Sequence, residues 1–133
     1  MILLLDTHVW IWSQEQPEKL GQQAVQALLA SENTNAVCTI STLEIARLLA
    51  IGTISLTIPL SEWIAQSLSA LAATTLPVTH EIATEAYALP SGFHKDPADR
   101  ILVAAARCHQ LTLLTADERI LQYPHVRTIN AQS

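Results

Sequence analysis

Residues 2–6 read Ile2-Leu3-Leu4-Leu5-Asp6, four large apolar residues followed directly by a carboxylate. The run has no polar alternation, which is typical of a strand that is covered on both faces in a parallel sheet. An ionised carboxylate at the end of such a strand is costly unless it is paired or binds a metal. We therefore predict that Asp6 has a functional role and lies at the carboxyl end of a central strand.

Beyond this strand the sequence alternates between apolar runs typical of strands and amphipathic segments typical of helices. We predict strands at residues 2–5, 36–40, 74–78, 111–114 and 126–129. We predict helices at residues 17–30, 41–50, 59–72, 79–89, 97–110 and 117–121. This alternation favours an α/β fold with a mainly parallel sheet and helices on both faces. No repeat or linker divides the sequence, so residues 1–133 are expected to form one domain.

The composition limits what the protein can bind. A net charge of −5 argues against simple electrostatic binding of nucleic acid. It does not exclude a nuclease, because each bound divalent cation adds two positive charges where a phosphate approaches. Only 14% of the residues are charged, and half are hydrophobic. We expect a partner, in a dimer or a complex, to cover part of this apolar surface.

The sequence contains no segment that we expect to cross a membrane. The longest uncharged stretch, residues 63–80, is too polar for a bilayer core. The first residues lack the basic region of a signal peptide, so we expect a cytoplasmic protein. The two cysteines, Cys38 and Cys108, lie in apolar surroundings without a CxxC pair and are expected to be buried free thiols.

The four aspartates all fall at a strand end or a helix start: Asp6, Asp96, Asp99 and Asp117. Glu44 lies near the start of another predicted helix. In an open α/β sheet, sites form just beyond the carboxyl ends of the strands, so these acids can converge. Several carboxylates on a small fold suit a hard cation such as Mg²⁺ or Mn²⁺. The pattern indicates metal-dependent phosphodiester chemistry.

Helix capping is the structural alternative for most of these acids. The segment Ser41-Thr42-Leu43-Glu44 fits a capping box. Asp96, which precedes a proline, fits an N-cap and places Asp99 at the third helical position. Asp117 can also cap a helix. Capping does not explain the strand-end aspartate, nor why aspartate is absent elsewhere.

Other polar residues near the acids have weaker claims to a role. Thr7, Thr115 and Asp96 are candidates for an outer shell around the metal. Turn and cap hydrogen bonds are the structural alternative for the two threonines.

Basic and aromatic residues also lie near the acids. Lys95 and Arg100 are candidates to bind flanking phosphates, and Arg47 is a further basic residue on a motif helix. We expect His8 and His94 to be surface or substrate-contacting residues rather than ligands, because their spacing forms no histidine ligand pair. Trp10 and Trp12 are expected to pack, with base stacking as the alternative.

Taken together, these residues resemble the PIN-domain family, and within it the VapC-type toxins of bacterial toxin–antitoxin pairs. The resemblance rests on four segments, whose order and spacing fit the family across nearly the whole chain: Leu3-Leu4-Leu5-Asp6-Thr7-His8-Val9-Trp10, Ser41-Thr42-Leu43-Glu44-Ile45, His94-Lys95-Asp96-Pro97-Ala98-Asp99-Arg100-Ile101-Leu102 and Leu113-Leu114-Thr115-Ala116-Asp117-Glu118-Arg119-Ile120-Leu121.

The resemblance implies a three-layer α/β/α sandwich with a parallel sheet of about five strands. It also implies RNA cleavage that depends on Mg²⁺ or Mn²⁺. The family's acidic set falls by position on Asp6, Glu44, Asp99 and Asp117, all as metal-binding and catalytic residues. Asp99 rather than Asp96 matches the third acid. Ala98 stands where relatives often carry a large aromatic, which is expected to alter the fit of the substrate and not the binding of the metal.

The resemblance further implies a cognate antitoxin that blocks the site, and a homodimer. Two other interpretations remain open. One is a phosphoryl-transfer domain with a strand-end aspartate nucleophile, although His8 stands where a haloacid-dehalogenase-like site needs a second aspartate. The other is an interaction module that keeps the fold and binds a partner without catalysis.

Overall fold

Five strands form a single sheet in the order β3-β2-β1-β4-β5. Their bounds are β1 Ile2–Leu5, β2 Thr34–Cys38, β3 Thr74–Leu76, β4 Thr112–Thr115 and β5 Thr128–Asn130. The computed structural model describes residues 1–133, and every pair of neighbouring strands in it is parallel. The carboxyl ends of all five strands therefore meet at one edge of the sheet. The predicted parallel sheet with β1 at its centre is confirmed.

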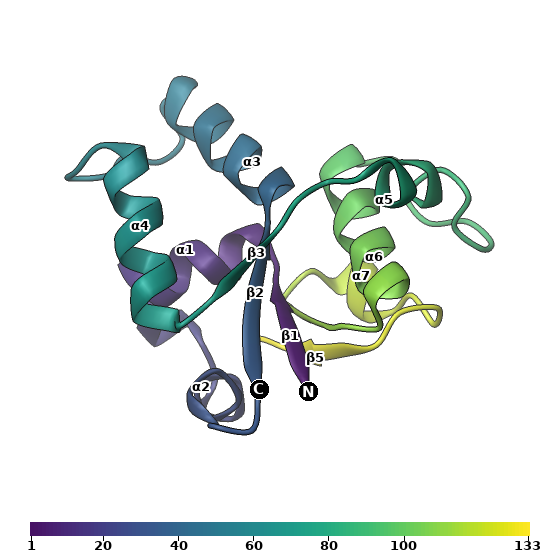
Figure 1. The fold of residues 1–133 in the computed structure, drawn as a ribbon, viewed down its shortest axis with the longest axis horizontal. Coiled ribbons are helices and arrows are strands. Elements are labelled where there is room, and N and C mark those ends of the chain that lie inside the picture. The colour runs from purple at the N-terminus through teal and green to yellow at the C-terminus, as the bar shows by residue number, and fades with distance from the viewer.

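Helices cover both faces of this sheet (Figure 1). Their bounds are α1 Thr7–Glu15, α2 Gln22–Leu29, α3 Thr39–Ala50, α4 Leu60–Leu71, α5 His80–Glu85, α6 Pro97–His109 and α7 Glu118–Leu121, with a short 3-10 helix, η1, at Pro17–Lys19. Helices α1 to α4 lie on one side of β1 and β2, and helices α5 to α7 lie on the other (Figure 1). The predicted three-layer α/β/α sandwich is confirmed.

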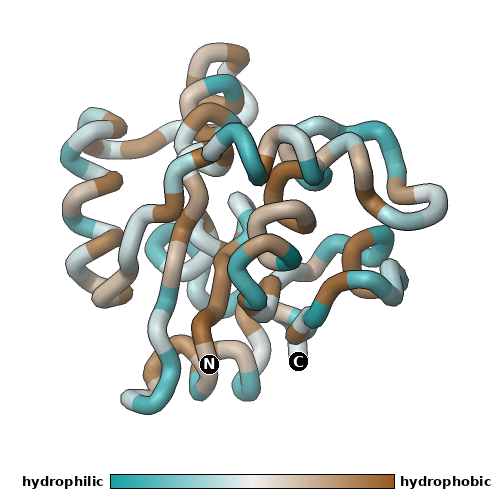
Figure 2. The backbone as a smooth tube through the Cα atoms, turned by 45° about the vertical axis from the view of Figure 1, so that its right-hand side comes forward, coloured by the Kyte–Doolittle hydropathy of each residue, from teal (hydrophilic) through white to brown (hydrophobic).

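Each face of the sheet carries its own hydrophobic core. Leu5 and Val37 pack with the side chains of α1, α3 and α4, whereas Leu4 and Ala36 pack with those of α5, α6 and α7. Side chains along a strand alternate between the two faces, so Leu4 and Leu5 of β1 enter opposite cores. This explains the unbroken apolar run at the start of the chain, which Figure 2 shows as the brown tube beginning at the N-terminus.

Helix α1 was not among the predicted helices. Its apolar residues Val9, Trp10 and Ile11 are consecutive and all buried, so the periodic pattern of an amphipathic helix does not appear. Trp10 packs against Trp63, with ring centroids 5.2 Å apart, and its indole N–H donates to the Ser67 hydroxyl at 2.9 Å. Tertiary packing of this kind stabilises a helix that the pattern alone does not indicate. The expected packing role of Trp10 is confirmed.

The helix predicted over residues 17–30 is in fact broken at Gly21, between η1 and α2. The end of the chain passes against this glycine, whose amide donates to the carbonyl of Ala131 at 2.9 Å. The carbonyl of Ser133 accepts from Gln23 at 3.0 Å. A Cβ atom at Gly21 would lie only 1.9 Å from that carbonyl oxygen. The close approach requires glycine, and the local sequence gives no sign of it.

Smaller differences concern element ends. Strand β2 and helix α3 each begin two residues before their predicted starts, at Thr34 and Thr39, and helix α5 ends at Glu85 instead of residue 89. Cys38 is buried as expected, but Cys108 is only half-buried, and both are free thiols. None of the helices combines the length and the apolar character that crossing a bilayer requires.

Replacement of Gly21 should test the docking of the chain end against α2. The backbone of Gly21 is ordinary (φ −73°), so alanine adds only the clash, and we expect Gly21→Ala to lower the free energy of unfolding by about 1–3 kcal/mol. Gly52 is the matched control, since it has φ +77° and open space around it. We expect Gly52→Ala to cost about 1 kcal/mol through the dihedral alone. Urea unfolding measures both; a Gly21→Ala protein as stable as the wild type would disprove the close approach.

Candidate metal centre

A cavity of about 330 Å³ lies at the carboxyl edge of the sheet. It is lined by residues that include all five acids singled out in the sequence: Asp6, Glu44, Asp96, Asp99 and Asp117. Asp6 directly follows β1, and Glu44 lies in the first half of α3. Asp96 and Asp99 lie at the start of α6, and Asp117 directly precedes α7. The convergence of distant acids, expected from the parallel arrangement of the strands, is present.

Asp6 lies at the floor of this cavity and is only 7% exposed. Its Oδ1 accepts from the Thr7 amide at 2.7 Å, and its Oδ2 accepts from the Thr115 hydroxyl at 2.6 Å. Burial raises the pKa of Asp6, and these two hydrogen bonds oppose the rise without cancelling it. Thr115 and the amide of Thr7 therefore fix the orientation of the carboxylate.

The capping box predicted at the start of α3 is wrong. Strand β2 runs directly into α3, whose N-cap, Cys38, makes no side-chain capping bond. Ser41 therefore lies inside the helix, is fully buried, and accepts a hydrogen bond from the Thr7 hydroxyl at 2.8 Å. This bond joins the start of α1 to α3.

Glu44, one helical turn beyond the start of α3, is free of a capping role. It lines the cavity, but its carboxylate pairs with Arg47 at 3.2 Å. Glu44 is thus placed at the cavity while its charge is shared with a neighbouring arginine.

The start of α6 follows the prediction closely. Asp96 is the N-cap, Pro97 is the first helical residue, and the Asp96 Oδ1 accepts from the Asp99 amide at 3.1 Å. The Asp99 side chain is 15% exposed. Its pKa is raised to about 7, first by burial and then by the negative charges of Asp6, Asp96 and Asp117. Asp96 therefore holds the backbone that carries Asp99.

Asp117 caps α7 and faces the cavity at the same time. Its Oδ1 accepts from the amides of Arg119, at 2.8 Å, and Ile120, at 3.3 Å. Its Oδ2 lies 3.4 Å from the Arg119 guanidinium. Burial raises the pKa of Asp117, but the hydrogen bonds from Arg119 and Ile120 outweigh burial, so the net pKa is lowered. One oxygen is used for capping, and the other faces the ion pair.

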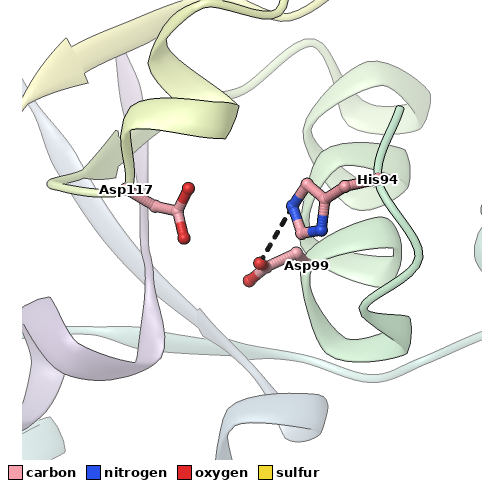
Figure 3. Close-up of side chains that lie close together, drawn as sticks. All are labelled: His94, Asp99 and Asp117. Carbon is pink, nitrogen blue, oxygen red and sulfur yellow. Dashed lines mark ion pairs between the residues drawn. The ribbon is translucent and has the colours of Figure 1, made fainter. Parts of the chain in front are cut away.

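His94, Asp99 and Asp117 place one ligand atom each within 4.8 Å of one another (Figure 3). His94 is less exposed than the surface interpretation expects, with a side chain 16% exposed and Nε2 3.2 Å from Asp99 Oδ2; contact with substrate stays a prediction. Burial, and then the Arg119 charge, lower the pKa of His94, so the ring is neutral at pH 7. Its Nδ1 accepts from the Asp96 amide at 3.4 Å, which leaves the proton on Nε2.

In this tautomer His94 presents an N–H, not a lone pair, to Asp99, although the angle is not that of a hydrogen bond. A ring nitrogen must be unprotonated to bind a metal. The Nε2 of His94 therefore lies beside Asp99 without a hydrogen bond, and metal ligation through Nε2 requires the other tautomer.

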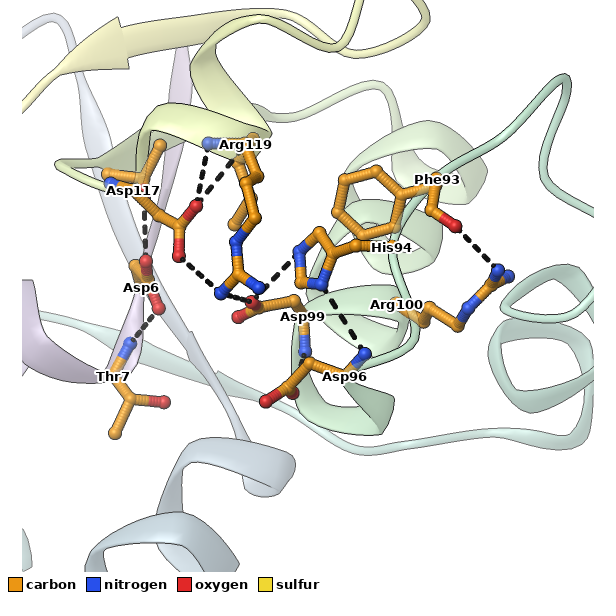
Figure 4. Close-up of polar contacts among 11 residues, drawn as sticks. Asp6, Thr7, Phe93, His94, Asp96, Asp99, Arg100, Asp117 and Arg119 are labelled. Atoms are coloured by element: carbon orange, nitrogen blue, oxygen red, sulfur yellow. Dashed lines mark hydrogen bonds and ion pairs between the residues drawn. The ribbon is translucent and has the colours of Figure 1, made fainter.

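Three basic residues proposed for phosphate contacts have different surroundings. Arg47 lines the cavity, whereas Lys95 is exposed outside it. Arg100 also lies outside the cavity. Its Nη1 donates to the Ala86 carbonyl at 2.9 Å, and its Nη2 donates to the Phe93 carbonyl at 2.9 Å (Figure 4). Arg100 fixes the loop before α6, and its guanidinium could bind a phosphate only by giving up one of these two carbonyls.

Arg119 is the cavity residue that the sequence analysis missed. Its guanidinium lies between Asp117 and Asp99 (Figure 4). Its position two residues after Asp117 was the available signal. Contact with Asp99, which comes from a different helix, could not be read from that position.

The side chains at the cavity fit a hard divalent cation. The donors are carboxylate oxygens, which Mg²⁺ and Mn²⁺ prefer. The negative charges are close enough to raise the pKa of Asp99, so the cluster is electrostatically unfavourable by itself. A cation among these oxygens would offset that repulsion.

Neutralising Asp99 should stabilise the metal-free protein at high pH. Its folded pKa, about 7, exceeds the ordinary value of 3.8, so stability falls as pH rises between these values. One pKa unit corresponds to about 1.4 kcal/mol. We compare the free energy of unfolding of Asp99→Asn with that of the wild type. Allowing for solvent screening, the difference in favour of the variant should be on the order of 2 kcal/mol larger near pH 8 than near pH 5.

Denaturant unfolding in EDTA at the two pH values measures this difference. Asp117→Asn serves as the control, because the lowered pKa of Asp117 gives stability that is lost only as pH falls below the ordinary value of 3.8. The titration of Asp117 itself therefore contributes no difference between the two pH values. If the stability gain of Asp99→Asn over the wild type were the same at both pH values, the pKa of Asp99 in the folded protein would not be raised.

Comparison with known proteins gives the same family that the motifs suggested. The PIN domain family model matches residues 3–126. Ribonuclease VapC22 of Mycobacterium tuberculosis is 38% identical over 127 residues, which are 96% of this chain and 95% of that protein.

Solved structures of similar fold include VapBC2 from Rickettsia felis bound to a promoter DNA fragment, with a TM-score of 0.69, 17% identity and 98% of each chain covered. They also include FitAcB from Neisseria gonorrhoeae, with a TM-score of 0.64, 24% identity and 97% of each chain covered. The family match contains all four of the acids assigned by position. The chain belongs to the PIN-domain family, among its VapC-type members.

Proposed function

We propose that this protein is a metal-dependent endoribonuclease that hydrolyses RNA phosphodiester bonds. The observation that carries the proposal is the convergence of Asp6, Glu44, Asp99 and Asp117 on one cavity at the carboxyl edge of a PIN-type sheet. The similarity to a protein named as a ribonuclease supports RNA as the substrate.

We assign Mg²⁺ or Mn²⁺ to Asp6, Asp99 and Asp117, with Glu44 completing the site or orienting the attacking water. When bound, such an ion supplies an activated water at neutral pH and offsets charge that develops on the phosphate. Thr115 and Thr7 hold Asp6 in place.

The other polar residues of the cavity act around these carboxylates. Asp96 acts in the outer shell, because its side chain bonds to the amide of Asp99 and not to a group in the cavity. Arg47, at the rim beside Glu44, is assigned to a phosphate that flanks the scissile bond. Lys95 is exposed outside the cavity and could reach only a more distant phosphate.

We further propose that the protein is the toxin of a toxin–antitoxin pair, acts on RNA in the cytoplasm and forms a homodimer. Similar folds come from a toxin–antitoxin complex of Klebsiella pneumoniae and from VapBC2 of Rickettsia felis. Large apolar side chains that a partner could cover are exposed on α2 and on and just after α3, namely Leu29, Leu43 and Ile51. Covering such side chains is a common use of a protein interface.

Substitution of the carboxylates should abolish cleavage. We expect Asp6→Asn and Asp99→Asn each to lower the rate of RNA cleavage in Mg²⁺ or Mn²⁺ by about 100-fold or more, because each removes a charge from the metal site. Glu62→Gln, on the exposed start of α4, is the matched loss of a carboxylate away from the cavity and should cleave like the wild type. Cleavage of a labelled RNA, followed on a gel with and without EDTA, is the measurement.

Two results of this assay would count against the proposal. Cleavage that persists in EDTA would mean that no metal is required. A wild-type protein that binds RNA or a protein partner and cleaves nothing would instead support the interaction module. Covalent trapping of Asp6 by beryllium fluoride would favour the phosphoryl-transfer domain.

A further inference from the structure

One nitrogen of Arg119 bridges the two carboxylates at the centre of the cavity. Its Nη2 lies 3.4 Å from Asp117 Oδ2 and 3.8 Å from Asp99 Oδ2 (Figure 4). These are the carboxylates whose oxygens, together with His94, lie within 4.8 Å of one another. The guanidinium thus contacts the two carboxylates that a divalent cation at this cluster would need.

We propose that Arg119 is an internal counter-ion of the metal centre, which holds Asp99 and Asp117 together in the metal-free protein and is displaced when a divalent cation binds. The released guanidinium then binds a phosphate of the substrate RNA in the same cavity. The first step concerns metal binding alone, whereas the second rests on the proposed ribonuclease function.

A divalent cation and Arg119 compete for Asp117 because only one oxygen of this carboxylate is available to either of them. Its Oδ1 accepts two backbone amides at the start of α7 and is committed to capping. Its Oδ2 has Arg119 as its only contact among the hydrogen bonds and ion pairs of the structure. A cation that binds Asp117 without uncapping α7 must therefore bind Oδ2, where the guanidinium lies.

The side chain of Arg119 is able to leave this position. It is 61% exposed, and its Nη2 lies 3.4 and 3.8 Å from the two carboxylate oxygens, which is longer than a charge-assisted hydrogen bond. Its backbone amide remains bonded to Asp117, so the side chain can rotate away while α7 stays capped. The side chain lines the cavity, which keeps the released charge close to any phosphate bound there.

The other arginines near the cavity do not offer this exchange. Arg47 pairs with Glu44 and makes no contact with Asp99 or Asp117. Arg100 donates to two backbone carbonyls outside the cavity. Arg119 is the one basic side chain paired with both central aspartates.

The affinity for Mn²⁺ in the absence of RNA tests the displacement, with titration calorimetry of the full-length protein. We expect Arg119→Gln to bind Mn²⁺ about threefold more tightly or better, because the metal no longer displaces the two ion pairs of the exposed Arg119 side chain. Arg119→Lys keeps the charge without the planar fork and should lie between the variant and the wild type. Arg127→Gln, an exposed arginine bonded to the Gln110 carbonyl, makes the same change in net charge and should bind like the wild type.

Cleavage at saturating Mn²⁺ tests the second step. We expect Arg119→Gln to raise the KM for RNA by about tenfold, the effect of losing one charged hydrogen bond to a phosphate, with partial rescue in Arg119→Lys. A variant that binds metal more tightly yet cleaves RNA less well is a combination that loss of folding does not produce.

The possible failures are distinguishable. Arg119→Gln that binds Mn²⁺ no better than the wild type overturns the displacement. Tighter Mn²⁺ binding together with an unchanged KM overturns the phosphate contact. Wild-type protein that binds Mn²⁺ but cleaves no RNA overturns the ribonuclease and the phosphate contact, and leaves the displacement supported. Absence of Mn²⁺ binding in every variant overturns both proposals.

Discussion

The hydrogen bond from the Thr115 hydroxyl to Asp6 Oδ2, at 2.6 Å, joins the carboxyl ends of the two central strands, β1 and β4. A buried carboxylate is tolerated only with partners of this kind, and the Thr7 amide supplies a second one. All strands are parallel, so whatever follows each strand meets at this edge. The buried Asp6 therefore lies at the edge of the sheet where the other acids also converge.

Helix N-termini supply three of those other acids. Asp96 and Asp117 each cap a helix with Oδ1, and Asp99 lies in the first turn of α6. The positive end of a helix dipole lowers the cost of gathering negative charge. The capping and the functional explanations of these residues, which looked like alternatives in the sequence, therefore describe the same side chains. Capping orients a carboxylate, and the oxygen left over faces the cavity.

The carboxylates at the cavity repel one another, and the stability of the rest of the fold must offset this repulsion. Asp99 has a pKa of about 7 because it is buried among other carboxylates, and only Arg119 pairs with both of the central aspartates. A fold with two hydrophobic cores, one on each face of the sheet, supplies the stability needed to keep such charges together. The proposed metal would relieve this repulsion, because a divalent cation adds two positive charges among the carboxylates.

The sequence by itself determined the order of strands and helices, the central strand, the two helix caps at Asp96 and Asp117, and the acids that reach the cavity. These features depend on apolar runs and on neighbours within a few residues. Tertiary structure alone decided the rest: consecutive apolar residues of α1 became a helix by packing, and the break at Gly21 came from the chain end. Arg119 reached Asp99, twenty residues away in the chain, because α6 and α7 start at the same edge of the sheet. Contacts between segments distant in sequence leave no periodic or local signal, so only the folded chain shows them.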